Sequence, residues 1–221
     1  MPLSFSEYVR LYNIEPELHP GEIEELFEKY IVTGGFPPSI NEYPYDDILS
    51  AYIGEIVRYG RSLEIAREVL SSIISTSPSS ASYRALATRT SGYSYKVVQS
   101  YIEFFCDLYL INVAYLRQRR RILYRREKKF FFRDPLLLQL FSDWTGTPYL
   151  ESALYEQIVQ EHMFRKYGKV YYYRNAYEID VVVDSLRVEV KAGKPHRRYP
   201  KNVQVVDREK LLFFLLELYN S

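Results

Sequence analysis

The sequence contains little sulfur and no long apolar run. Among its 221 residues there are two methionines and one cysteine, so Cys106 has no partner for an internal disulfide and is predicted to be a small buried apolar residue. We expect no signal peptide, and no segment approaches the roughly 20 apolar residues of a membrane-spanning helix. These absences predict a cytoplasmic protein in a reducing compartment, with no membrane partner.

Charge is present in quantity and is segregated along the chain. Residues 1–57 hold eleven acidic residues against Arg10 and Lys29, whereas residues 117–133 hold nine basic residues against Glu127 alone. A second basic cluster lies within 191–201. Segregation of this kind is typical of a surface that binds a polyanion. The alternative is a solvated basic face that pairs with the acidic N-terminal region; we favour phosphate contact because both basic clusters lie in the same half of the chain.

The first 59 residues are predicted to be helical. Apolar residues recur at helical spacing within 21–33, and Gly34-Gly35 supplies the usual end of a helix. The Pro pair in "GGFPPS" then predicts a turn, because proline cannot continue a helix. A second helix is expected over 46–59, with apolar positions up to Val57 facing inward.

Residues 60–145 predict a winged helix. An amphipathic helix over 62–75 precedes a short helix over 83–90, a turn at Ser91-Gly92 and a longer helix over 94–108, which is the order of a helix-turn-helix. Strands are expected over 111–116, 120–126 and 128–134 as a basic wing. In DNA-binding modules of this kind the second helix enters the major groove, so Lys96 and Gln99 are candidates for base contact. Winged helices also serve as protein-protein modules, which is the alternative.

Residues 146–221 predict a small α/β domain. A helix over 150–168, stopped by Gly168, leads into strands over 169–174, 176–183 and 186–193. A strand over 202–207 and an amphipathic helix over 208–219 close the chain. The predicted fold class is therefore α+β and multidomain, with a helical region, a winged helix and an α/β domain in that order.

The second and third of these strands form a hairpin with one charged face. If the turn is centred on Asp184-Ser185, counting outward sets Asp180 opposite Glu189 and Glu178 opposite Lys191. The apolar pairs, Val183 with Leu186, Val181 with Val188 and Ile179 with Val190, then share the other face. Glu178 and Lys191 would make an ordinary ion pair, but directly opposed carboxylates are destabilising.

The repulsion between Asp180 and Glu189 needs an offset: solvent, a shared proton, a basic side chain or a bound cation. A divalent ion is one candidate, because Mg²⁺ binds one or two carboxylates together with substrate phosphates. Lys191 would then orient a water that attacks a phosphodiester. The alternative is a solvated strand face whose carboxylates meet by coincidence.

Two resemblances bear on this choice. The pattern of Asp180, Glu189-x-Lys191 and the helical Glu156 resembles the PD-(D/E)XK nuclease superfamily. In addition, "LSFSEY", "YIVTGGFPPSI", "KFFFRDPLL", "LYEQIV", "EIDVVV" and "VEVKAG", in this order, resemble the C-terminal part of the archaeal-type AAA ATPase family over nearly the whole chain. In that family a P-loop ATPase core precedes a helical lid, a winged helix and a nuclease-like domain.

The resemblance implies three domains, namely a lid-like region (1–59), a winged helix (60–145) and a PD-(D/E)XK nuclease-like domain (146–221). The chain contains no G-x-x-x-x-G-K-[ST], so no nucleotide-binding residue and no ATP are expected. A P-loop ATPase core, in cis or in trans, is an expected partner.

The predicted function is that of a DNA-binding protein with a metal-dependent DNA endonuclease-like domain. The expected catalytic residues are Asp180, Glu189, Lys191 and Glu156, of which Asp180, Glu189 and Glu156 would hold Mg²⁺ or Mn²⁺. The expected DNA contacts are Lys96, Gln99, Arg119, Arg120, Arg121, Arg125, Arg126, Lys194, Arg197 and Arg198. The alternative is a non-catalytic DNA-binding or regulatory module of a larger ATPase, with the nuclease fold used as a scaffold.

Overall fold

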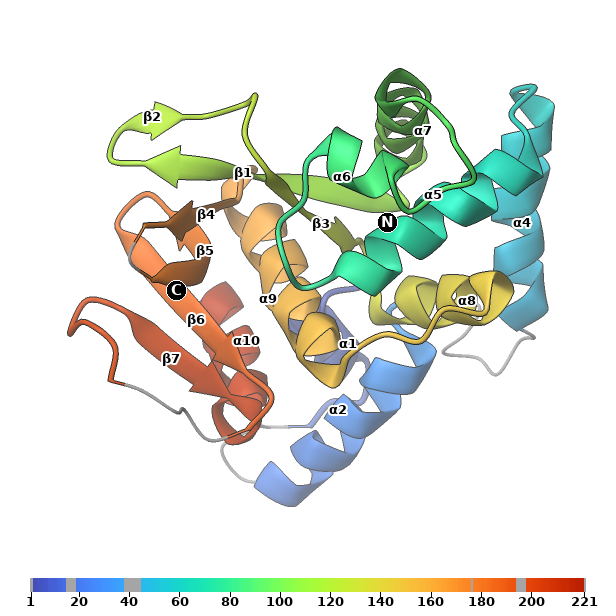
Figure 1. Cartoon of the computed structure of the whole chain (residues 1–221). Coiled ribbons are helices and arrows are strands. Elements are labelled where there is room, and N and C mark those ends of the chain that lie inside the picture. The colour runs from blue at the N-terminus through green and yellow to red at the C-terminus, as the bar shows by residue number, and fades with distance from the viewer. Residues whose placement is uncertain (1, 15–18, 38–44, 176, 194–197, 221) are drawn as a thin grey trace.

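The structure is a computed structural model that describes the chain except residues 1, 15–18, 38–44, 176, 194–197 and 221 (Figure 1). Within the described residues it is an α+β fold with nine helices and a mixed sheet of seven strands. The helices are α1 (Phe5–Leu11), α2 (Pro20–Thr33), α4 (Tyr45–Arg58), α5 (Leu63–Thr76), α6 (Tyr83–Ala87), α7 (Tyr95–Asp107), α8 (Pro135–Thr145), α9 (Glu151–Tyr167) and α10 (Arg208–Asn220). The strands are β1 (Ile111–Gln118), β2 (Arg121–Ile122), β3 (Lys128–Phe132), β4 (Tyr171–Arg174), β5 (Glu178–Val183), β6 (Leu186–Lys191) and β7 (Gln204–Asp207).

The two helices predicted in the first region are confirmed as α2 and α4. Helix α2 ends at Gly34, whose φ of 62° is readily available only to glycine. In the predicted turn "GGFPPS", Gly34 and Gly35 do form a turn, while Pro38 and Ser39 lie outside the described residues. Val57 was expected to face inward, but it is 56% exposed because Ile56, which is fully buried, takes the inward position next to it.

Helices α1 and α8 were not predicted, although local signals mark both. Ser4 and Glu7 form a capping box at the start of α1, in which each side chain binds the other's backbone N–H. Asp134 caps α8 by accepting a hydrogen bond from the N–H of Leu136, and Pro135 occupies the first helical position.

The middle of the chain has the predicted order of elements. The hydroxyls of Ser62, Ser82 and Ser94 cap α5, α6 and α7, and α6 stops at Ala87, shorter than expected. The three strands follow, but β2 is only two residues long. Cys106 on α7 is partly buried against the core, and burial raises the pKa of its thiol to about 12.

One sheet joins the predicted second and third regions, in the order β2-β1-β4-β5-β6-β7 with β3 also paired to β1. Strand β1 pairs antiparallel with β3 and β2 and parallel with β4, where Tyr115 faces Tyr171. Strands β4, β5 and β6 form an antiparallel meander, and β7 returns parallel to β6. All predicted elements of the last region are present, and Gly168 ends α9 with φ 68°.

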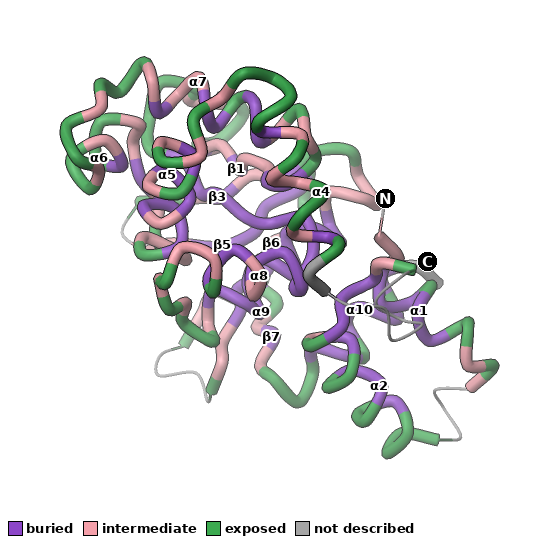
Figure 2. Tube along the Cα trace, turned by 90° about the vertical axis from the view of Figure 1, so that its right-hand side faces the viewer, coloured by how far each residue is buried: buried purple, intermediate pink, exposed green. Residues whose placement is uncertain are grey.

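Helix α9 lies against β3, β5 and β6, and α10 lies against β7 and α9. Figure 2 shows buried residues concentrated along these central elements. One hydrophobic core cluster runs from Phe5 to Leu218 and includes residues from all three predicted domains. The predicted boundaries fall at the ends of elements, since residue 59 follows α4 and residue 145 ends α8. Because α9 lies against β3 of the second predicted domain and against β5 and β6 of the third, it brings strands from two predicted domains together.

Candidate functional site

The hairpin of β5 and β6 has the predicted register. Val183 pairs with Leu186, and Val181 pairs with Val188. The turn occupies Asp184-Ser185, where Asp184 has φ 47°. In this register Asp180 and Glu189 are the next residues outward, as counted from the sequence.

The prediction that Ile179, Val181 and Val183 share one face is wrong. Ile179 and Val182 pack together in a small second cluster, whereas Val181 and Val183 belong to the main core. The pairing of β4 with β5 shifts register between Tyr171 and Tyr173, as at a β-bulge. The bulge interrupts the alternation of side chains between Ile179 and Val182, so the period of two is lost there.

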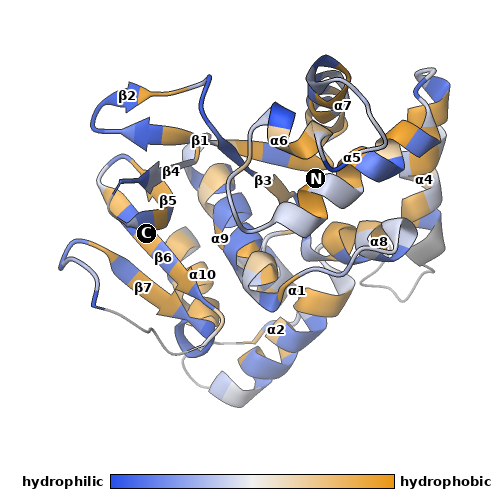
Figure 3. Ribbon diagram, viewed as in Figure 1, coloured by the Kyte–Doolittle hydropathy of each residue, from blue (hydrophilic) through white to orange (hydrophobic). Residues whose placement is uncertain are grey.

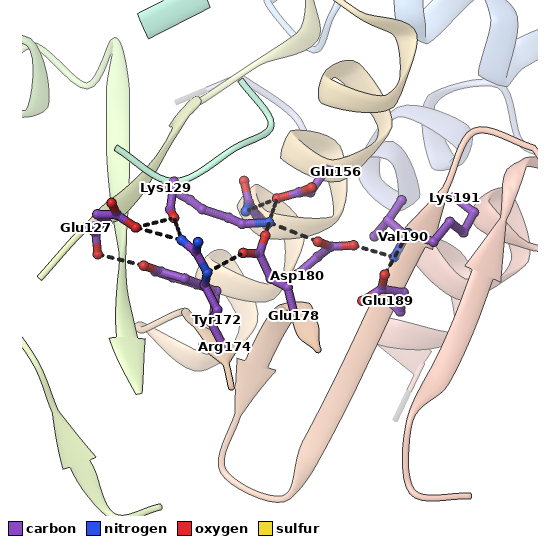
Figure 4. Close-up of polar contacts among 12 residues, drawn as sticks. Glu127, Lys129, Glu156, Tyr172, Arg174, Glu178, Asp180, Glu189, Val190 and Lys191 are labelled. Atoms are coloured by element: carbon purple, nitrogen blue, oxygen red, sulfur yellow. Dashed lines mark hydrogen bonds and ion pairs between the residues drawn. The ribbon is translucent and has the colours of Figure 1, made fainter. Parts of the chain in front are cut away.

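The ammonium of Lys129 lies among three carboxylates (Figure 4). Its Nζ is 2.7 Å from Glu178, 2.8 Å from Glu156 and 2.9 Å from Asp180. Only 3% of the Lys129 side chain is exposed. Strand β3 supplies the lysine, α9 supplies Glu156 and β5 supplies the other two acids. The lysine was not predicted as a site residue, because it lies in a segment whose basic residues indicated a surface.

Burial and the shared ammonium set the protonation of the cluster. Burial acts to lower the pKa of Lys129, but the charges of Glu156, Asp180 and Glu178 outweigh it and raise the pKa well above its ordinary value. Burial, followed by the charge of Asp180, raises the pKa of Glu156 well above its usual range. Burial also acts to raise the pKa of Asp180, but the contacts with Lys129 and with the N–H of Val190 lower it. The fold thus favours the protonated form of Glu156 and the ionised form of Asp180.

Glu189 has different partners. Its Oε1 accepts hydrogen bonds from Nζ of Lys191 at 2.6 Å and from the hydroxyl of Tyr199 at 2.8 Å. Burial, followed by the charge of Asp180, raises the pKa of Glu189. The predicted ion pair between Glu178 and Lys191 is wrong, since these residues bind Lys129 and Glu189 respectively.

Basic side chains therefore offset the repulsion between Asp180 and Glu189, which is one of the four alternatives that the sequence left open. The ammonium of Lys129 pairs with Asp180, and the ammonium of Lys191 pairs with Glu189. The second carboxylate oxygen of Asp180 accepts a hydrogen bond from the N–H of Val190 at 2.9 Å, which ties the acid to β6. Of the four expected catalytic residues, the structure joins Glu156 to Asp180 through Lys129, and Glu189 to Lys191 directly.

This arrangement does not fit a divalent ion. The position among Glu156, Glu178 and Asp180 is filled by the ammonium of Lys129, which hydrogen-bonds an oxygen of Glu156 and of Asp180. No group of three or more metal-ligating residues suited to a metal ion occurs in the described part of the chain. We therefore derive no chemical step through Mg²⁺ or Mn²⁺ at this site.

A second candidate site is formed by the antiparallel strands β1, β2 and β3 and the segments that join them, a unit called here the hairpin of β1, β2 and β3. The five predicted arginines, Arg119, Arg120, Arg121, Arg125 and Arg126, are all exposed. Figure 3 shows that the turn between β1 and β2 and the segment that leads into β3 are strongly hydrophilic. One hollow of about 840 Å³ is lined by Arg119, Arg120, Arg121 and Tyr173, and another of about 570 Å³ by Arg125, Arg126 and Arg174. The hairpin is thus a cationic surface with two recesses.

Three of the nine basic residues in 117–133 do not belong to this surface. Lys128, Lys129 and Arg133 are buried, with exposures of 5%, 2% and 5%. Lys128 Nζ lies 4.6 Å from the ring centroid of Tyr83, and Arg133 Nε lies 2.7 Å from Glu161. The interpretation of the whole segment as a basic surface is therefore wrong in its last part, because β3 runs through the core.

The remaining predicted DNA contacts divide into three groups. Lys96 is exposed near the start of α7, while Gln99 is partly buried and its amide donates to Glu103 at 2.8 Å. Arg198 is exposed. Lys194 and Arg197 lie outside the described residues.

The fold and the two sites define an α+β protein with a cationic hairpin and a buried carboxylate-lysine cluster. Residues 24–147 match the family described as a domain of unknown function (DUF8612), which is more than half of the chain. The chain belongs to this family. Comparison with curated proteins and with solved structures gave no match. Within the described residues, no helix has the length and apolar character needed to cross a membrane.

Proposed function

We propose that this chain is a non-catalytic DNA-binding protein that contacts duplex DNA through a winged-helix segment. The observation that carries the proposal is the cluster of five exposed arginines on the hairpin of β1, β2 and β3. Arginine binds phosphate with a planar fork of N–H donors, and contacts with phosphates supply most of the affinity of proteins for DNA. The hairpin follows α7 directly, as the wing follows the recognition helix in a winged helix.

Helix α7 supplies the candidate base contacts. Its N-terminal turn carries the exposed Lys96, while Val98 and Ile102 are buried and hold the helix on the core. In a winged helix that binds DNA, residues at this end of the second helix reach the base edges, and the wing contacts the backbone. In this arrangement Lys96 would contact base edges in the groove, and the hairpin arginines would contact the backbone phosphates.

The nuclease-like region would serve as a scaffold in this proposal. Its carboxylates already hold the ammonium of Lys129 at 2.7 to 2.9 Å, so a catalytic metal has no place among them in this arrangement. Metal-dependent cleavage is the rival function, and it predicts Mn²⁺-dependent nicking of plasmid DNA that is lost in Asp180→Ala. We expect no nicking by either protein. A P-loop ATPase core as partner stays a prediction from the resemblance.

The test is fluorescence anisotropy of a labelled duplex at several salt concentrations. A variant with Arg119, Arg120 and Arg121 replaced by alanine should bind more weakly, and the slope of log affinity against log salt should decrease by up to about 2.7, since each of three lost phosphate contacts removes about 0.9. The control replaces three exposed cations elsewhere, Arg10, Arg58 and Lys210, and changes the net charge equally. Equal slopes in the two variants, or no binding by the wild type, would reject the hairpin as the DNA contact.

A further inference from the structure

Strand β3 delivers a lysine to a place where a cation is required. All five of its residues are buried, and Lys129 extends beside the ring of Tyr172, whose centroid is 5.8 Å from Nζ. Without the ammonium, the buried carboxyl groups of Glu156 and Asp180 and the partly exposed carboxyl group of Glu178 would face one another. Two buried like charges at such a distance repel strongly because the surrounding dielectric constant is low.

The distances around Nζ describe a cage of oxygen atoms. Three carboxylates from two elements each place an oxygen at 2.7 to 2.9 Å from the nitrogen. Calcium binds oxygen ligands at about 2.3–2.6 Å in flexible geometry, and magnesium requires about 2.0–2.1 Å with near-ideal octahedral geometry. A calcium-sized ion would need the cage to contract by only a few tenths of an ångström, whereas magnesium would need a contraction of about 0.6 to 0.9 Å.

We propose that Lys129 is a built-in cation that takes the place of a divalent ion, and that removing its ammonium opens a calcium-type binding site formed by Glu156, Glu178 and Asp180. The wild-type protein then needs no metal to hold the cluster together. Selectivity follows from the size of the cage, so a Lys129→Ala protein binds Ca²⁺ and the lanthanide Tb³⁺ more tightly than Mg²⁺. The inference concerns the cluster alone and does not rest on DNA binding.

Tyr172 provides a direct readout. Tb³⁺ emits weakly unless a nearby aromatic ring transfers energy to it, and an ion at the position of Nζ would lie about 5.8 Å from the Tyr172 ring. Excitation of tyrosine should therefore give saturable Tb³⁺ emission with Lys129→Ala and not with the wild type. Excess Ca²⁺ should displace Tb³⁺ at a concentration at least about tenfold lower than Mg²⁺ does, because of the size argument above.

Two controls separate this site from the many acidic residues on the surface. Lys128→Ala removes the neighbouring lysine, which donates to the carbonyl of Arg126 and has no carboxylate of the cluster as a partner, so it should give no new emission. The double variant Lys129→Ala with Asp180→Asn removes one ligand and should bind Tb³⁺ at least about tenfold more weakly than Lys129→Ala. Emission that is equal in the wild type, in Lys128→Ala and in the double variant would overturn the proposal.

A second measurement covers the case in which Lys129→Ala does not fold in a metal-free buffer. Millimolar Ca²⁺ should then restore its far-ultraviolet circular dichroism, and it should raise the melting temperature if the variant is folded already. The wild type should show no such shift. A Lys129→Ala protein that neither binds Tb³⁺ nor gains stability from Ca²⁺ would show that Lys129 fills no latent cation site.

Discussion

Glu156 and Asp180 hold the same ammonium at 2.8 and 2.9 Å, yet the structure shifts the pKa values of the two acids in opposite directions. Burial raises the pKa of Glu156, whereas Lys129 and the Val190 N–H outweigh burial and lower the pKa of Asp180. The fold therefore favours the protonated form of Glu156 and the ionised form of Asp180, although both contact the same lysine.

This difference predicts unequal costs for two matched substitutions. Glu156→Gln resembles the protonated acid and should change the free energy of unfolding by less than about 1 kcal/mol. Asp180→Asn removes a buried charge opposite Lys129 and leaves its one oxygen to serve either the lysine or the Val190 N–H, so it should cost about 3 kcal/mol. Urea unfolding at pH 7 measures both values. Equal costs would contradict the assignment of the proton to Glu156.

His162 predicts that stability decreases between pH 7 and pH 5. It is buried in α9, where its Nε2 accepts a hydrogen bond from the N–H of Phe5 at 2.9 Å and its Nδ1 lies 2.7 Å from the carbonyl of Ile158. Burial, followed by the charge of Arg165, lowers the pKa of His162 from 6.5 to about 3. The unfolded chain therefore binds a proton as the pH falls through 6.5, and the folded chain does not, which favours unfolding.

Between pH 7 and pH 5 this group should remove about 2 kcal/mol from the free energy of unfolding. His162→Gln keeps an acceptor for the Phe5 N–H and does not titrate in this range. Urea unfolding at several pH values should therefore give a shallower dependence on pH for the variant, and carboxylates that titrate near pH 5 contribute to both proteins alike. The same dependence in both proteins would show that His162 does not remain neutral in the fold.

Regular patterns allowed much of this fold to be predicted from the sequence. The register of the hairpin follows from a symmetric turn at Asp184-Ser185, and helix ends follow from residues such as Gly34 and Gly168. The bulge near Asp180 was not predicted, because its cause is the pairing of β5 with β4 and not the sequence of β5 itself. Local rules cannot anticipate a neighbour that shifts the register.

Lys129 is the residue of the carboxylate-lysine cluster that was not predicted from the sequence. In the sequence it is one of nine basic residues in 117–133, and composition alone indicates a surface position for all of them. The apolar run of Phe130, Phe131 and Phe132 directly after it was the available signal, since such a run is typical of a strand inside the core. The partners of Lys129 lie 27 to 51 residues away along the chain, and only the packing of α9 on both parts of the sheet brings them together.

If α7 is the recognition helix, as proposed above, two neighbouring side chains on it should differ in their effect on DNA binding. One N–H of the Gln99 amide donates to Glu103 at 2.8 Å, so a bidentate contact of Gln99 with adenine would have to compete with this hydrogen bond. Gln99→Ala should therefore change the affinity for duplex DNA by less than about twofold, while Lys96→Ala should weaken it by about three- to tenfold through loss of a charged contact. Glu103→Ala removes an acid and should strengthen binding. Anisotropy titrations of the three variants check this order. A larger loss of affinity for Gln99→Ala than for Lys96→Ala would show that Gln99, and not Lys96, makes the main contact with DNA.

Gly35 and Gly54 predict opposite effects of the same substitution. A Cβ on Gly35 would lie 2.0 Å from the carbonyl oxygen of Leu3, a backbone atom that cannot move away alone, and the Gly35 N–H donates to Asp134 at 2.9 Å. Gly35→Ala should therefore cost at least about 2 kcal/mol. Gly54 lies within α4 with nothing within 4 Å of the added Cβ, so Gly54→Ala should stabilise the protein by about 0.5–1 kcal/mol. Urea unfolding of both variants tests the close contact of Gly35 with Leu3 and Asp134, and a neutral Gly35→Ala would show that this contact is loose.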